Sequence, residues 1–345
     1  MLADVEERNS ELSRVYEQID GLLAATLEVD DYVDLDELRA TVEHPPFSRR
    51  DLEVPIPIPE SETLPLEPVY SDPPPPTGVR AIFGKRKYEA AISKAELLHR
   101  RRTESWQEKT ARILSKNQLA LDRHKADEET RRAALQDAKE RHQNECQKRE
   151  SEADAQNKSI DLLIANLGYG VKEAVEEYLS IVLSNSVYPP EFMVTHKSTF
   201  DVPTAELGLR VLVPGPSELP TEKVFKYVKA ADEIRATQHS QKTRKDRYAG
   251  AVHQVALRSL HEIFEADRRG IIKSISLEVG TNALDTGTGL EKHVSLVGVA
   301  ADRESFLLIN LEHVTPRDTL DYLGAAVSKD PFGLKPVDVS GIRRS

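Results

Sequence analysis

The sequence predicts an α+β protein: a long N-terminal helical or coiled-coil arm, followed by a small domain with a mostly antiparallel sheet. Two observations carry this prediction. Residues 83–166 contain no proline, a single glycine and many Glu, Lys, Arg, Gln and Ala residues, which is the composition of a helix. Residues 248–267 repeat apolar side chains at helical spacing between strand-like segments, which is typical of a helix with one side buried against a sheet.

The first 80 residues contain two kinds of sequence. Residues 1–40 are expected to be a short amphipathic helical segment, because the apolar side chains of residues 2–27 fall near one face of a helix. Residues 41–80 hold most of the prolines, in the runs HPPF, VPIPIPE, LPLEPVY and SDPPPP. Proline fixes φ and removes a backbone donor, so this stretch is predicted to be an extended linker. The alternative is a ligand for a proline-recognition domain; a plain spacer is favoured.

Residues 81–167 are expected to form a long charged helix, about 120 Å long if unbroken. The apolar seam is poor, because Glu128 interrupts the seven-residue spacing of Leu114, Leu121 and Leu135. A better seam is formed at the start by Ile92, Ala95, Leu98, Trp106 and Ile113. Strong coiled coils keep apolar seams for several heptads, so both a coiled coil and a helical hairpin remain open. Self-association through residues 83–166, as a dimer, is expected.

Residues 168–338 are expected to form the α+β domain, and residues 339–345 an exit linker. The domain is predicted to begin with a helix that the prolines of YPPEF stop, followed by alternating strand sequence over 193–213. Helical turns near 221–236 and a basic loop at 239–247 precede the central helix. Two further strands, IIKSISLEVG and HVSLVGVAADRESF, flank the turn GTNALDTGTG, and a last helix begins at Thr315 and Pro316.

Composition excludes several classes of protein. The net charge is −11, so DNA contacts need local basic patches rather than a basic chain. The single cysteine, Cys146, excludes an internal disulfide and a thiolate zinc cluster, in keeping with a reducing cytoplasm. The first residues lack the pattern of a secretory signal, and no apolar run approaches about 18 residues. A cytoplasmic location without membrane contact is therefore expected.

Several segments together resemble a known family. They are AVEEYLSIVLSNSVYPPEF, VLVPGP, FKYVKAADEI, YAGAVHQVALRSLHEIFEAD, HVSLVGVAADRESF and LDYLGAAVSKDPFGLKPVDVSGIRRS, over roughly residues 174–344. These segments resemble the region upstream of the nuclease domain in Mrr-like restriction system proteins, the type IV restriction enzymes common in actinobacteria. The resemblance implies a role in anti-phage defence, in a parent family of DNA endonucleases.

The nuclease chemistry of that family is not expected in this chain. In the family, a segment like GIRRS leads into a PD-(D/E)xK domain, which needs an acidic residue and a (D/E/Q)-x-K triplet on a strand to hold metal and activate water. The nearest candidates, Lys242 and Lys292, fit no such triplet. No catalytic residue, metal site or cofactor is therefore predicted here, and Mg²⁺ is expected only in a linked nuclease domain. The sequence is then either part of a longer enzyme or a relative without the nuclease.

Two smaller patterns favour structural interpretations. The triplet Asp285-Thr286-Gly287 matches aspartic proteases, but that chemistry needs two such aspartates, and a hairpin turn is the simpler prediction. His253 and His261 lie eight residues apart, whereas metal pairs on a helix usually lie four apart with a third ligand. Both histidines are therefore expected to be structural.

Two basic clusters are candidate DNA contacts. Residues 85–102 contain seven Lys or Arg residues against two Glu, and a solvated charged helix is the favoured interpretation of this cluster. The hypothesised DNA-binding residues are Lys242, Arg244, Lys245, Arg247, Arg343 and Arg344. The expected function is the DNA-sensing and oligomerising region of an Mrr-like restriction protein, with weak, phosphate-mediated DNA binding. The alternative is a non-catalytic scaffold that binds a partner protein.

Overall fold

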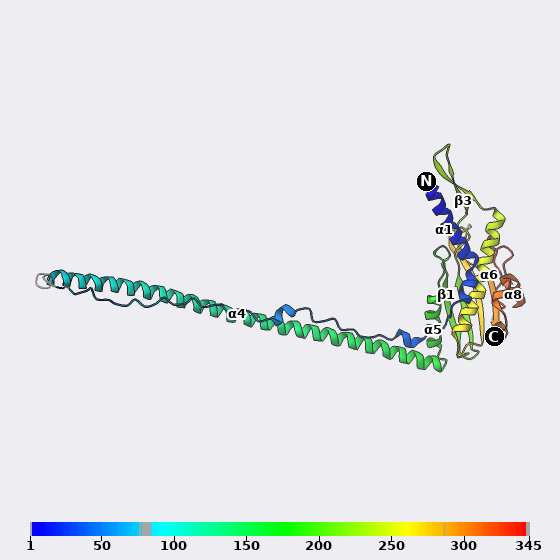
Figure 1. Cartoon of the computed structure of the whole chain (residues 1–345). Helices are drawn as coiled ribbons and strands as arrows, with labels where there is room; N and C mark the ends of the chain where they lie inside the picture. Colours follow the sequence, from blue (N-terminus) through cyan, green and yellow to red (C-terminus); the bar gives the residue numbers. More distant parts are fainter. Residues whose placement is uncertain (1, 76, 78–83, 286, 343–345) are drawn as a thin grey trace. The chain divides into compact units, whose positions relative to one another are not determined.

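The computed structural model describes residues 2–75, 77, 84–285 and 287–342, and confirms the predicted α+β class (Figure 1). The chain divides into two compact units. One unit comprises Met1–Ala40 together with Ala155–Ser345, and the other comprises Thr41–Asp154. Residues 1–40 and 155–167 thus belong to the same compact unit as the strands.

The unit Thr41–Asp154 is built on helix α4, which runs from Lys85 to Gly168 as one helix of 84 residues. The helix is continuous, so the helical hairpin considered from sequence is not formed. No proline interrupts it, and its only glycine is its last residue, Gly168. Uninterrupted helix-forming residues therefore suffice to explain its length.

The proline-rich residues 41–75 lie along α4 rather than free of it, and we call them the proline strap (Figure 1). The strap contains one short 3₁₀ turn, η2 (Arg50–Glu53). It runs antiparallel to the helix. Four contacts mark its course: His44 with Glu150 at 2.9 Å, the ring centroids of Phe47 and His142 at 5.6 Å, Trp106 with Pro65 at 2.8 Å, and the ring centroids of Tyr70 and His99 at 5.3 Å.

The lengths of the strap and of α4 explain why the strap can follow the helix from end to end. From His44 to Tyr70 the strap advances 26 residues, which span about 80 Å at the rise of polyproline II. From Glu150 to His99 the helix advances 51 residues, which span about 77 Å at 1.5 Å each. One residue of an extended strap therefore matches about two residues of helix over the whole length.

Polar side chains of the helix supply hydrogen bonds to the strap. A polyproline-like chain makes no internal hydrogen bonds. Asn117 supplies two, since its Oδ1 accepts from Glu62 N–H at 2.9 Å and its Nδ2 donates to Glu62 O at 3.0 Å. Glu128, which interrupts the apolar seam, accepts from Ile56 N–H at 3.2 Å. The side chain of Trp106 donates to Pro65 O.

The strap also covers most of the seam that suggested a coiled coil. Of its five predicted members, Ile92, Ala95, Trp106 and Ile113 are half-buried, whereas Leu98 is exposed. The best apolar stripe of α4 therefore has a partner within the same chain.

Tryptophan fluorescence reports on the strap, because Trp106, the only tryptophan in the sequence, contacts Pro65 of the strap. Asn117→Ala removes two hydrogen bonds to the strap, worth about 1 kcal/mol each. We expect a red shift of the tryptophan emission and faster proteolysis within residues 41–75. Gln118→Ala is the matched control, because among the described residues the side chain of Gln118 bonds to Asp122 of the same helix and not to the strap. An unchanged spectrum and digestion rate for Asn117→Ala would show that the strap does not depend on this contact.

The other unit combines helices and two sheets. Its helices are α1 (Leu2–Asp20), α2 (Leu22–Leu27), the end of α4, α5 (Lys172–Asn185), α6 (Gln241–Ala266), α7 (Arg303–Leu307) and α8 (Pro316–Tyr322), with 3₁₀ turns η1 (Leu35–Leu38), η3 (Pro190–Phe192) and η4 (Leu311–His313). Its strands are β1 (Thr195–Asp201), β2 (Glu206–Leu212), β3 (Glu222–Val228), β4 (Glu233–Gln238), β5 (Ser274–Leu284), β6 (Glu291–Asp302) and β7 (Ala326–Val327). None of the described helices has the length and apolar character needed to cross a membrane.

The main sheet has the strand order β1-β2-β5-β6-β7. All neighbouring strands are antiparallel except β2 and β5, which are parallel and connected through β3, β4 and α6. Helix α6 packs on β5 and β6, and α5 packs on β1 and α6. The apolar residues that predicted α6 are buried: Val252, Val255, Ala256, Leu260, Ile263 and Phe264 are at most 1% exposed.

Two predictions for this unit are wrong. Residues 221–236, expected as helical turns, form most of the antiparallel hairpin β3–β4. The basic segment 239–247, expected as a loop, includes the first two turns of α6, which Ser240 caps by accepting from Thr243 N–H at 3.1 Å. Helix α1 covers the hairpin, and Asn9 binds the backbone N–H and carbonyl of Phe225 at 2.7 and 3.0 Å.

Candidate functional site

The four described cations predicted to bind DNA lie on the first two turns of α6, and three of them have partners within the domain. Arg247 forms a two-pronged ion pair with Asp20, at 2.9 and 3.0 Å, and lies 3.9 Å from the Tyr16 ring centroid. Lys245 pairs with Asp330 at 3.3 Å. These contacts reduce the charge available to an outside phosphate.

The remaining predicted residues differ in accessibility. Arg244 lies 5.4 Å from the ring centroid of Phe332. Lys242 is exposed and has no ion pair with any residue that the structure describes. Arg343 and Arg344 lie outside the described residues. Of the four predicted residues that the structure describes, Lys242 is therefore the one that is exposed and has neither an ion pair nor an aromatic contact.

The other basic cluster, at the start of α4, is arranged differently. Its seven cations are Lys85, Arg86, Lys87, Lys94, Arg100, Arg101 and Arg102, and all are exposed. None forms an ion pair within the described part of the chain. The first turn of α4 carries no acidic side chain, so the partial positive charge of the helix N-terminus adds to the cluster. The sequence showed this cluster, but it could not show that its charges would stay unpaired.

The Asp285 turn has the predicted structural role. It connects β5 and β6, with Asp285 N–H donating to Leu290 O at 2.8 Å. The carboxylate of Asp285 accepts from Gly287 N–H at 2.8 Å and from Thr288 N–H at 3.0 Å. These backbone hydrogen bonds lower the pKa of Asp285. Its carboxylate therefore stabilises the hairpin turn.

A buried polar network between α2, α6 and the segment after α5 was not apparent from sequence. At its centre, Arg258 pairs with Glu262 at 2.6 Å, and both are nearly inaccessible to solvent. Ser186 donates to Glu262 at 2.6 Å, and Thr26 donates to it at 3.1 Å. The guanidinium also donates to Leu22 O and Val187 O, each at 3.1 Å. The network thus ties two chain segments, α2 and the segment after α5, to α6.

Polar atoms beside this network lack partners. Glu262 Oε2, Ser259 Oγ, Tyr188 Oη and His196 Nε2 are buried and have no hydrogen-bond partner among the described residues. Burial lowers the pKa of His196 to about 4, against the opposing effect of the Glu262 charge. Two cavities of about 580 and 560 Å³ adjoin the network and share Ser186 and Tyr188 in their linings. Polar groups and cavities together indicate space for small polar molecules or water.

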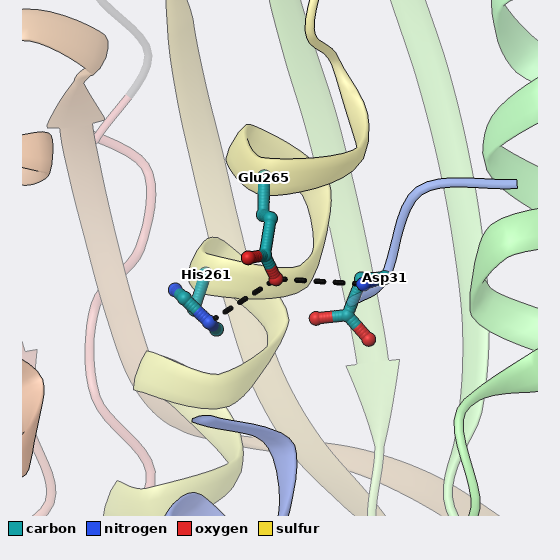
Figure 2. Close-up of side chains that lie close together, drawn as sticks. All are labelled: Asp31, His261 and Glu265. Atoms are coloured by element: carbon teal, nitrogen blue, oxygen red, sulfur yellow. Dashed lines mark hydrogen bonds and ion pairs between the residues drawn. The ribbon is translucent and has the colours of Figure 1, made fainter. Parts of the chain in front are cut away.

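Three side chains of kinds that can bind a metal ion, those of Asp31, His261 and Glu265, lie close together at the edge of this network (Figure 2). His261 and Glu265 lie one turn apart on α6, with Nε2 and Oε2 3.4 Å apart. Asp31 follows α2, and its backbone N–H is 3.5 Å from Glu265 Oε2. One candidate ligand atom from each residue lies within 4.8 Å of the other two. Burial, followed by the charge of Glu262, raises the pKa of Asp31 to about 7.

The two histidines singled out from sequence differ in their surroundings. His253 is buried, and its Nε2 has no partner among the described residues. Burial, with a smaller effect of Arg317, lowers the pKa of His253 to about 4. His261 is half-buried beside two carboxylates. The sequence pattern paired His261 with His253 and could not show that His261 lies near Asp31, because Asp31 is 230 positions away.

Comparison of the chain with protein-family models, with curated proteins and with solved structures finds no match.

Proposed function

We propose that this chain is a non-catalytic module that binds the phosphate backbone of DNA through residues 85–102 of α4, within an Mrr-like restriction system for anti-phage defence. The observation that carries the proposal is the set of seven exposed cations that form no ion pair with any described residue. DNA affinity depends chiefly on such charges, because each neutralised phosphate releases condensed counterions. Binding of this kind is weak, insensitive to base sequence and steeply dependent on salt.

The start of α6 is a second point of contact in this proposal. Lys242 offers a free charge there, while Arg247 and Lys245 already have carboxylate partners. The acidic remainder of the chain, with its net charge of −11, restricts DNA to these two basic surfaces. The resemblance of residues 174–344 to the region upstream of a nuclease supports the link to restriction. In this proposal, DNA cleavage and its Mg²⁺ belong to a linked nuclease domain, and the protein acts in the cytoplasm.

A scaffold function is the second candidate. It is favoured by five exposed leucines on α4, namely Leu97, Leu98, Leu114, Leu119 and Leu121, which the proline strap leaves uncovered. We propose that they contribute to dimerisation, because exposed apolar groups on a long helix are stabilised by a partner helix. Light scattering at tens of micromolar should give about twice 38.6 kDa. A monomer at that concentration would contradict self-association.

The DNA-binding proposal predicts that Arg100→Glu/Arg101→Glu/Arg102→Glu weakens binding at least about tenfold. The measurement is fluorescence anisotropy with a labelled duplex at low and moderate salt. Arg123→Glu/Lys125→Glu/Arg141→Glu is the matched control. It makes the same change of charge at exposed positions of the same helix, where acidic residues balance the basic ones. Lys242→Glu tests the contribution of α6.

Each outcome has a distinct meaning. A large loss for the Arg100–Arg102 variant, with a small loss for the control, supports the proposal. Equal losses would show that the chain responds only to net charge. No binding by the parent at low salt would contradict the proposal and leave the scaffold function.

A further inference from the structure

Asp31, His261 and Glu265 bring three candidate ligand atoms within 4.8 Å of one another, and the two from α6 have the spacing of ligands around one small cation. A metal ion held at 2.0–2.2 Å by two tetrahedral ligands separates them by about 3.3–3.6 Å. Nε2 of His261 and Oε2 of Glu265 are 3.4 Å apart. Figure 2 shows the carboxylate of Asp31 approaching the same space from the segment after α2, opposite the helix. No rearrangement of the helix is needed to bring the two α6 ligands together.

The charged side chains around this space carry more negative than positive charge. Asp31, Glu262 and Glu265 bring three carboxylates together. The nearby cation, Arg258, is already bound to Glu262 at 2.6 Å. Thr26 has one hydroxyl proton for two acceptors, at 3.1 Å from Glu262 and 3.4 Å from Asp31. Partly buried carboxylates in such a cluster need either a proton or a cation.

We propose that Asp31, His261 and Glu265 bind one divalent transition-metal ion, with Zn²⁺ as the best fit. One imidazole nitrogen and two carboxylate oxygens suit Zn²⁺ better than Mg²⁺ or Ca²⁺, which prefer all-oxygen sites. Three protein ligands leave at least one position for water or for an outside ligand.

The ion would fasten the N-terminal segment onto α6. Asp31 belongs to the stretch between α2 and η1, and both other ligands belong to α6. In the structure this stretch contacts α6 and its C-terminal end through the long Asp31 contact, the exposed pair of Asp30 with Arg268, and the Tyr32 ring 4.0 Å from Arg268. Metal binding should therefore stabilise the fold of this unit, since an ion that binds only the folded state shifts the unfolding equilibrium.

The test is calorimetric titration of the full chain, freed of metal by a chelator, with Zn²⁺. We expect saturation at one ion per chain, and a Zn²⁺-dependent rise of the melting temperature. Glu265→Gln and His261→Gln should each weaken binding at least about tenfold and abolish the rise in melting temperature. Both residues are partly exposed, so neither change leaves a deeply buried group without a partner.

His293→Gln is the matched control. His293 also pairs with a glutamate, Glu278, at 2.7 Å, but no third metal-ligand side chain among the described residues joins that pair. Binding by this variant should equal that of the parent. The proposal is overturned if the parent binds no Zn²⁺ stoichiometrically, or if binding survives both ligand variants. It is also overturned if Mg²⁺ binds the site as tightly as Zn²⁺ does.

Discussion

Replacing Arg258 by leucine is expected to lower the free energy of unfolding by about 3–5 kcal/mol. The change leaves the carboxylate of Glu262 buried without its cation, and it removes the donors to Leu22 O and Val187 O. Helix α2 and the segment after α5 then lose their polar anchor on α6. Urea denaturation followed by circular dichroism measures the effect.

Two further variants separate the ion pair from simple loss of volume. In Arg258→Leu/Glu262→Leu the unpaired charge is gone, so we expect most of the lost stability to return. Arg317→Leu removes an exposed pair with Asp321 on α8 and should cost less than about 1 kcal/mol. If Arg258→Leu is as mild as Arg317→Leu, the buried pair does not stabilise this unit.

The second large effect is a loss of stability as the pH falls from about 6.5 to about 4. The pKa of His196 and that of His253 are each lowered to about 4 in the folded state, chiefly by burial. In that interval each histidine is protonated in the unfolded chain but still neutral in the folded chain. Acid therefore favours unfolding. Above pH 6.5 both states are neutral there, and this contribution vanishes. Each histidine contributes up to about 3 kcal/mol.

Asp31 has the opposite effect on stability in the same pH range, so the parent alone cannot isolate the histidines. The measurement therefore compares the parent with His196→Gln and His253→Gln. The raised pKa of Asp31 means that the folded chain keeps a proton there that the unfolded chain releases, so stability falls as the pH rises through about 7. The parent should lose more stability than either variant between pH 6.5 and 4. Parallel stability curves for parent and variants would show that these histidines titrate normally.

The sequence was sufficient for features that depend on local patterns. The spacing of Val252, Val255, Leu260 and Phe264 predicted the buried face of α6, because one face of a helix is set by nearby residues. The glycines after Asp285 predicted the turn between β5 and β6. The absence of proline from residues 85–168 predicted a long helix, since nothing interrupts its hydrogen bonds.

Features that depend on distant partners were missed. The proline strap looked like a free linker because of its prolines, and Glu128 seemed only to interrupt a coiled-coil seam. In the structure Glu128 and Asn117 bind the strap's backbone. The segment 239–247 looked like a loop because it is so charged, although Lys, Arg and Gln are good helix formers and Ser240 is a good cap. Asp31 and Glu265 come together only through tertiary folding.

The salt dependence of DNA binding tests the central proposal most directly. If seven phosphates are neutralised by residues 85–102, the slope of log Kobs against log salt concentration for the parent should be roughly −6. Reversal of Arg100, Arg101 and Arg102 leaves four cations and should reduce the slope to roughly −3.6. The Arg123, Lys125 and Arg141 control should keep the slope of the parent. A slope near zero, or one that the Arg100–Arg102 variant leaves unchanged, would contradict phosphate binding by this segment.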